Sequence, residues 1–104
     1  MSGTRHDTRL CIAPDHPALP GHFPGAPVVP AVLLMDRVLE LAEDWLGGPL
    51  GVAGLPQAKF RAPLLPGEEA RVRLELDSLR LRFRVEVGAA LIAQGVFELA
   101  GPAS

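Results

Sequence analysis

The residues with the most evident chemistry lie in one stretch, 21–36, which reads GHFPGAPVVPAVLLMD. His22 stands in a segment stiffened by prolines, because each proline fixes its own φ and biases the preceding residue towards extended backbone. Pro30 suits the first turn of a helix, where N–H groups have no partner within the helix. Asp36 follows about one and a half turns later, among leucines. A rigid histidine, free N–H groups and a buried acid would form a general acid–base site with an oxyanion donor.

A simpler interpretation of the same residues stays open. A histidine in a proline-rich loop is commonly a surface residue, and an aspartate on a helix is commonly solvated. His16 is a second candidate in the preceding loop, but it lacks the aromatic–proline element and the helix that follow His22. His6 lies near the N-terminus, where we expect it to be exposed. Residue types alone therefore do not decide between a catalytic and a solvated His22 and Asp36.

One helix is expected, over residues 30–46. Its apolar side chains recur at three- and four-residue spacing: Val32, Leu33, Met35, Leu39, Ala42 and Leu46. Gly47, Gly48 and Pro49 then end it, since glycine suits the cap and proline cannot continue a helix. Trp45, near the end of this helix, is expected to be a core or interface aromatic.

The rest of the chain has the pattern of β-structure. Strands are expected over residues 8–13, 52–61, 70–76, 79–87 and 90–99, with a possible bulge at Gly95. Residues 1–7 and 100–104 are expected to be frayed. The apolar strand faces need a cover, and the single helix can supply it. We therefore predict an α+β fold in which a strongly curved antiparallel sheet wraps around one long helix.

Two blocks of the chain resemble a known family. The first has His22, Phe23, Pro24, Pro27, Pro30 and Asp36 at the spacing His-Phe-Pro-x-x-Pro, then Pro-Gly, then an apolar helix carrying Glu or Asp. The second, residues 58–68, is similar to KF-x-x-P-x-x-PG-D/E. Together they resemble the hotdog-fold, FabA/FabZ-like 3-hydroxyacyl-(acyl carrier protein) dehydratases over about residues 10–99. Within that family the short proteins of aryl-polyene-type fatty acid synthesis are the most similar.

The resemblance implies a fold, a reaction and an assembly. It implies one hotdog domain over residues 1–104, with an ordered core over about 8–99. The reaction would remove water from a 3-hydroxyacyl thioester on acyl carrier protein, giving a trans-2-enoyl thioester in fatty acid or polyene biosynthesis. The protein would be a homodimer with sites at the subunit interface. No cofactor and no metal are expected.

The resemblance also implies roles for single residues. His22 would remove the proton next to the thioester carbonyl, and the backbone N–H of Ala31 would bind the enolate oxygen. Asp36 would protonate the leaving hydroxyl, for which burial among leucines favours the protonated acid. The residues expected to position the substrate are Phe23, Pro24, Gly25, Pro30 and Val32. In dimers of this family the histidine and the acid come from different subunits.

Three departures from the family pattern keep other functions open. Ala31 replaces the usual glycine; it keeps the N–H, but its methyl group would crowd the site if φ were positive. Glu40 replaces the usual glutamine one turn after the acid, and the longer N-terminal segment of typical relatives is missing, which would shorten or open the acyl tunnel. One alternative is a weakly active or inactive acyl-binding accessory subunit. Another is a hotdog acyl thioesterase, whose carboxylate would activate water.

The composition restricts partners and location. The 104 residues carry a net charge of −2, which argues against a nucleic acid partner. A single cysteine, Cys11, excludes an intrachain disulfide and suits the reducing cytoplasm. Cys11 lies in an apolar strand pattern, so we expect a buried, inert thiol. No segment has the layout of a signal peptide or the length of a membrane span.

Arginines recur at alternate positions of the strands expected over 70–76 and 79–87. They form a stripe on the face opposite the core. A solvated sheet face with interspersed glutamates explains the stripe, since one face of an antiparallel sheet commonly meets water. Electrostatic steering of an acidic carrier protein is the functional alternative.

Overall fold

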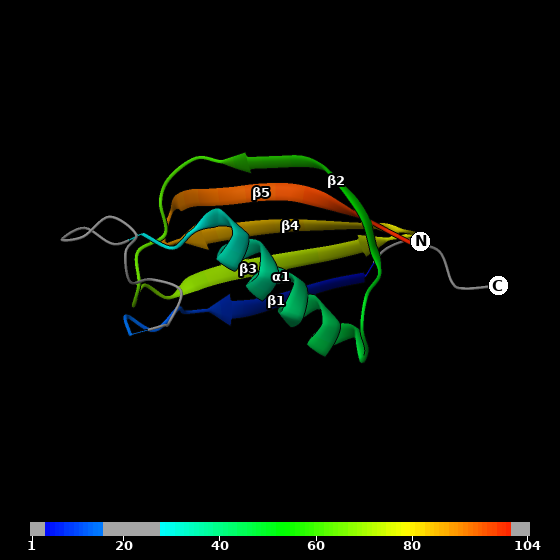
Figure 1. Cartoon of the computed structure of the whole chain (residues 1–104), viewed down its shortest axis with the longest axis horizontal. Helices are drawn as coiled ribbons and strands as arrows, with labels where there is room; N and C mark the ends of the chain where they lie inside the picture. The colour runs from blue at the N-terminus through cyan, green and yellow to red at the C-terminus, as the bar shows by residue number, and fades with distance from the viewer. Residues whose placement is uncertain (1–3, 16–27, 101–104) are drawn as a thin grey trace.

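One helix lies across one face of a five-stranded antiparallel sheet in the computed structural model, which describes residues 4–15 and 28–100 (Figure 1). The elements in chain order are β1 (Thr4–Leu10), α1 (Ala31–Leu46), β2 (Val52–Phe60), β3 (Ala70–Asp77), β4 (Arg80–Val87) and β5 (Ala90–Leu99). The strand order across the sheet is β1-β3-β4-β5-β2. The predicted curved antiparallel sheet with one helix is confirmed. The helix in the described ranges is not long and apolar enough to cross a membrane.

Strands β3, β4 and β5 form a meander joined by tight turns. Arg80 pairs with Asp77 across the first turn, where Ser78 has φ 57°, and the second turn contains Gly88 with φ 58°. Within β3 and β4 every second side chain is buried, because alternate residues of a strand point to opposite faces. The alternation read from the sequence therefore places the valines, leucines and Phe83 on the inner face and the arginines on the outer one.

The bounds of α1 follow from the residues that flank it. Pro30, with φ −61° and ψ 145°, is the extended residue before the first turn. Gly47 ends the helix in the left-handed region at φ 85°, and its N–H donates to the carbonyl of Glu43 at 2.8 Å. The carboxylate of Glu43 also accepts from the N–H of Leu50 at 2.9 Å, which fixes the return of the chain towards β2.

The side of α1 that packs on the sheet differs from the predicted one. The fully buried helix residues are Leu34, Val38 and Ala42, spaced four residues apart. Val32, expected in the apolar stripe, is 73% exposed. Leu33 and Met35 of the predicted stripe pack at the margin of the core, and the inner face of the sheet buries the row centred on Val38. Trp45 packs against the core cluster, as expected.

Predictions for the N-terminal segment were wrong in three respects. Strand β1 begins at Thr4, inside the segment expected to fray, because its backbone pairs with β3 over its whole length. His6 is half-buried and stacks on Trp45, with ring centroids 5.2 Å apart and planes 9° from parallel. Cys11 is exposed, since β1 ends at Leu10 and the chain leaves the sheet there.

Gly95 is not a bulge but a point of close approach. It keeps regular register with Ala58 of β2 and with Phe83 of β4. A Cβ at this position would lie 2.7 Å from the ring of Phe83 and would also collide with the carbonyl oxygen of Gln57. Glycine is therefore required because its neighbours occupy the space of a side chain.

We predict that Gly95→Ala destabilises the protein by about 1–3 kcal/mol, the usual cost of forcing extra volume into a packed site. Gly54→Ala is the matched control in β2, because a Cβ there meets nothing within 4 Å. Its effect should lie within about 0.5–1 kcal/mol, on the stabilising side. Urea unfolding of both variants measures the difference, and equal stabilities would contradict the close approach.

Candidate active site

An open apolar groove of about 350 Å³ lies at the N-terminal end of α1. Its lining comes from the segment before the helix, the helix start, and the ends of β2 and β5: Val28, Val29, Ala31, Leu34, Phe60, Arg61, Ala62, Pro63, Leu64 and Ile92. Two backbone hydrogen bonds hold its walls together, from the N–H of Val29 to Leu64 and from the N–H of Arg61 to Ile92, both 2.8 Å long. The groove suits an apolar chain with a polar group at the helix end.

Ala31 places the helix N-terminus at this groove. The first bond within the helix runs from the N–H of Leu34 to the carbonyl of Pro30 at 3.0 Å, so the N–H groups before Leu34 have no partner in the helix. Among the described residues Ser78 is the only non-glycine with positive φ, so Ala31 has ordinary helical backbone. The strain considered for alanine at this position is therefore absent. The N–H of Ala31 lies at the positive end of the helix dipole, where it can bind a developing oxyanion.

Asp36 is exposed in the single chain, and the expected burial among leucines is wrong for this state. It stands two positions after Leu34, which turns it about 200° around the helix axis to the side away from the sheet. Glu40, one turn further on the same side, accepts a hydrogen bond from Arg37 at 2.9 Å. The second carboxylate is thus paired with a guanidinium. No residue of 4–15 or 28–100 covers Asp36.

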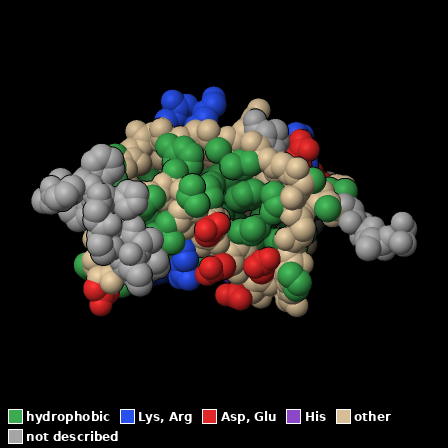
Figure 2. Space-filling view, in the orientation of Figure 1, with side chains coloured by type: hydrophobic (Ala, Val, Ile, Leu, Met, Phe, Trp, Pro, Cys, Tyr) green, Lys and Arg blue, Asp and Glu red, His purple; other side chains and the backbone are tan. Residues whose placement is uncertain are grey.

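The surface around Asp36 and the groove is apolar. Figure 2 shows hydrophobic side chains gathered in the middle of this face, with acidic side chains directly beside them. Val32 is 73% exposed, Phe60 46% and Leu55 42%. In Figure 1, α1 crosses in front of β1, β3 and β4, while β2 lies beyond it.

The remaining expected site residues, His22, Phe23, Pro24 and Gly25, lie outside the described residues, as does His16. Val28, six residues after His22, is the first described residue beyond this segment, and it lines the groove. Of the expected residues, the structure therefore brings Ala31 to the groove and leaves Val32 and Asp36 on the exposed side of α1. In residues 4–15 and 28–100 no three His, Cys, Asp or Glu side chains form a group that could hold a metal ion.

Sequence reasoning missed the apolar walls of the groove, among them Phe60, Leu64 and Ile92. The sequence of residues 58–68 indicated the first two, because two prolines follow the end of the strand and make the chain turn there. Ile92 carried no such signal, since it reaches the groove only through the pairing of β5 with β2.

Comparison with solved structures defines the class of protein. The chain matches a chain of "The Dehydratase Heterocomplex ApeI:P" from Xenorhabdus doucetiae with a TM-score of 0.83 and 26% identity, covering 93% of this chain and 88% of that one. The fluoroacetyl-CoA thioesterase FlK shares the fold at a TM-score of 0.70 and 20% identity, with 96% and 86% covered. The protein is a hotdog-fold protein.

Sequence comparison specifies the family. The family described as "ApeI-like: ApeI dehydratase" matches residues 1–96, and the chain belongs to it. The 3-hydroxyacyl-[acyl-carrier-protein] dehydratase FabZ of Pelotomaculum thermopropionicum is 32% identical over 90 residues, which cover 80% of this chain and 64% of that protein. FabZ of Alkaliphilus metalliredigens is 32% identical over 100 residues, covering 89% and 66%. The chain thus spans slightly less than two thirds of the length of these curated relatives.

Proposed function

We propose that the protein is a 3-hydroxyacyl-thioester dehydratase that acts on a substrate carried by acyl carrier protein. The observation that carries the proposal is the free helix N-terminus at Ala31, which opens onto an apolar groove in a chain of the ApeI-like dehydratase family. The groove would hold the acyl chain near its thioester end. The named function of the FabZ relatives supports the substrate class.

The proposed reaction assigns one role to each group. The imidazole of His22 removes a proton from the carbon next to the thioester carbonyl, since its ordinary pKa of about 6.5 leaves much of it neutral at working pH. The N–H of Ala31 donates to the carbonyl oxygen as negative charge develops on it. Protonated Asp36 gives its proton to the hydroxyl on the next carbon, which leaves as water. The product is a trans-2-enoyl thioester, and proton exchange with solvent resets both side chains.

A partner subunit is part of this proposal. Asp36 must be protonated to act as the acid, and its side chain is exposed in the single chain. Covering the exposed side of α1 would bury Asp36 with Val32, and burial favours the neutral acid. We propose a homodimer in which His22 of one subunit meets Asp36 of the other. The heterocomplex of the related ApeI chain makes a partner of different sequence the alternative.

The site supports the dehydratase proposal over its alternatives. The helical φ of Ala31 removes the main argument for an inactive accessory subunit. Likeness to FlK at 20% identity concerns the fold and adds nothing in favour of thioester hydrolysis. We propose a cytoplasmic location, because the lone cysteine suits a reducing compartment.

Two substitutions at residue 31 test the oxyanion donor. Ala31→Pro removes the N–H at the first helical position, where proline is well tolerated and where extended Pro30 suits a following proline. It should lower kcat by about 10²–10³-fold with little loss of stability. Ala31→Gly keeps the N–H and should leave kcat nearly unchanged, at a stability cost of up to about 1 kcal/mol. Full activity of a folded Ala31→Pro protein would exclude this donor.

Mixed dimers test the pairing of His22 with Asp36. His22→Ala and Asp36→Asn should each abolish turnover of a 3-hydroxyacyl carrier-protein substrate, followed by mass detection of the loss of water, while light scattering still shows dimers. A dimer with one chain of each kind has one doubly damaged site and one intact site. Mixing the two inactive variants should therefore restore part of the activity.

The results distinguish the pairing across the interface from the dehydratase function itself. If subunit exchange is demonstrated and no activity returns, the two residues do not meet across the interface. If both single variants keep full activity, the dehydratase proposal is wrong. A wild-type monomer at micromolar concentration that becomes active only with a different chain identifies the heterocomplex alternative.

A further inference from the structure

One residue of β5 has no partner on β4. Val85 of β4 pairs with Ala93. Glu86, the next residue of β4, pairs with Leu91, so the register shifts between these two pairs. The additional residue of β5 is Ile92. A β-bulge of this kind adds one residue to one strand of an antiparallel pair and bends that strand.

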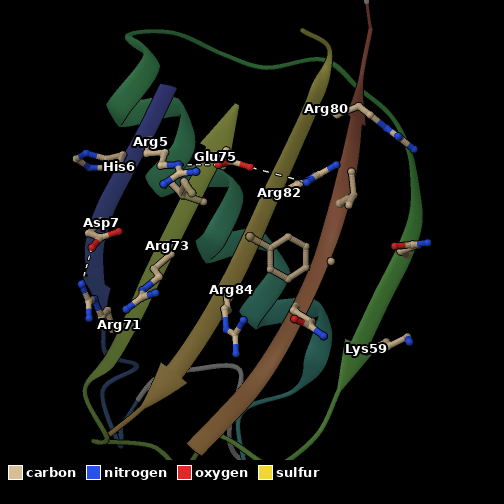
Figure 3. A pocket seen from close by; sticks show the side chains of 16 residues that line it. Arg5, His6, Asp7, Lys59, Arg71, Arg73, Glu75, Arg80, Arg82 and Arg84 are labelled. Atoms are coloured by element: carbon tan, nitrogen blue, oxygen red, sulfur yellow. Dashed lines mark hydrogen bonds and ion pairs between the residues drawn. The ribbon is translucent and has the colours of Figure 1, made fainter. Parts of the chain in front are cut away.

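Strand β4 itself stays regular beside the bulge. Its pairing with β3 is unbroken, and Arg84 and Arg73 stand opposite each other on the outer face of the sheet (Figure 3). Glu86 lies on the same face, since its carboxylate is 3.4 Å from Arg73 and 3.2 Å from Arg84. The alternation of side chains therefore continues through β4, and the irregularity belongs to β5.

The bulge turns the side chain of Ile92 to the inner face of the sheet. Consecutive side chains of a regular strand point to opposite faces. Ile92 and Ala93 are nevertheless both buried in the hydrophobic core, at 4% and 0% exposure. In an unbroken register Ile92 would stand opposite Glu86, on the charged outer face. Bulges are common beside active sites, where they redirect a side chain in this way.

The backbone of Ile92 fixes one wall of the groove. Its carbonyl accepts from the N–H of Arg61 at 2.8 Å and from the N–H of Ala62 at 3.4 Å. These two residues begin the segment after β2 that lines the groove. Because the carbonyl makes these bonds, the side chain of Ile92 can be changed without removing them.

The side chain of Ile92 lies at the floor of the groove. Leu34 and Leu64, which line the groove with it, are each 2% exposed, whereas Phe60 is 46% exposed. The three buried side chains close the groove towards the core, and Phe60 stands at its rim. The groove measures about 350 Å³, near the lower end of the range of about 300–1,000 Å³ that is usual for ligand pockets. A closed floor and a small volume suit a short apolar chain.

The larger hollow among the described residues does not suit an apolar chain. It measures about 1040 Å³ and lies on the outer face of the sheet (Figure 3). Arg71 donates to Asp7 there at 2.6 Å, and Arg5 donates to Glu75 at 2.7 Å. The hydrogen bond from Arg71 holds the pKa of Asp7 below its usual value of 3.8, so this carboxylate is charged at neutral pH. An acyl chain on this face would have to desolvate such charges.

We propose that Ile92 sets the length of the acyl chain that the groove accepts. The thioester carbonyl lies at the N–H of Ala31, and the acyl chain follows the apolar walls until its end meets the side chain of Ile92. One methylene more or less in an apolar pocket changes kcat/KM by about 10–200-fold. This proposal rests on the proposed function and adds to it the limit on the acyl chain.

The two isoleucines of the chain allow a matched test. Ile12 is buried like Ile92, at 2% exposure, but it does not line the groove. Ile92→Val and Ile92→Ala shorten the side chain at the floor of the groove, whereas Ile12→Val and Ile12→Ala make the same changes elsewhere in the core. The substrates are the 3-hydroxyhexanoyl and 3-hydroxydecanoyl thioesters of N-acetylcysteamine, and mass detection follows the loss of water.

The measured quantity is the ratio of kcat/KM for the decanoyl substrate to kcat/KM for the hexanoyl substrate. Ile92→Ala should raise this ratio by about tenfold or more, and Ile92→Val should raise it by less. Both Ile12 variants should keep the wild-type ratio. The ratio does not depend on the fraction of folded protein, so a loss of stability does not imitate the effect. An unchanged ratio in the Ile92 variants, or the same rise in the Ile12 variants, would overturn the proposal.

A binding measurement on the wild-type protein is independent of turnover. Isotope labelling of the isoleucine Cδ1 methyl groups gives one signal for each isoleucine, and the two valine variants assign them. Decanoyl amide of cysteamine, which has no hydroxyl group to lose, should shift the signal of Ile92 and leave that of Ile12 in place. A shift of Ile12 alone, or of neither signal, contradicts the proposal. If neither thioester is turned over while Ile92 still shifts, the limit on the acyl chain stands and the dehydratase proposal fails.

Discussion

The packing of Leu34, Val38 and Ala42 against the inner face of the sheet sets the rotation of α1, and the site depends on that rotation. Burial of these three side chains turns Asp36 away from the sheet. It also leaves Ala31, three residues before Leu34, at the mouth of the groove. A rotation that buried Val32 instead would move both groups. The apolar contact of the helix thus determines where the polar chemistry can take place.

Helix α1 covers only part of the inner face of the sheet, and the groove lies beside the end of β2, which α1 does not cross. Helix α1 lies over β1, β3 and β4, and the stacking of Trp45 on His6 fixes its far end over β1 (Figure 1). Gly95 of β5, the neighbour of β2, leaves room on the inner face for the ring of Phe83. An exposed apolar strip that includes Phe60 remains. Phe60 of that strip forms part of one wall of the groove.

Charge is separated between the two sides of the molecule. The exposed side of α1 carries Asp36, Glu40 and Asp44, whereas the outer sheet face carries most of the arginines. Strand β2 borders both sides, with Lys59 facing outward and Phe60 facing inward. A net charge of −2 conceals this arrangement because the two sides nearly cancel.

The sequence by itself determined the elements and much of the candidate site. Pro30 and Gly47 bound the helix, alternation in residues 70–87 defined the meander, and the histidine–proline motif indicated the reaction. These features are local, so residue types and spacing are enough to reveal them. Tertiary structure decided what depends on distant neighbours. Pairing with β3 made an ordered strand of Thr4–Leu10, and burial of Leu34, Val38 and Ala42 left Asp36 exposed. Cross-strand register decided which arginines have carboxylate partners, because those partners lie up to 70 residues away.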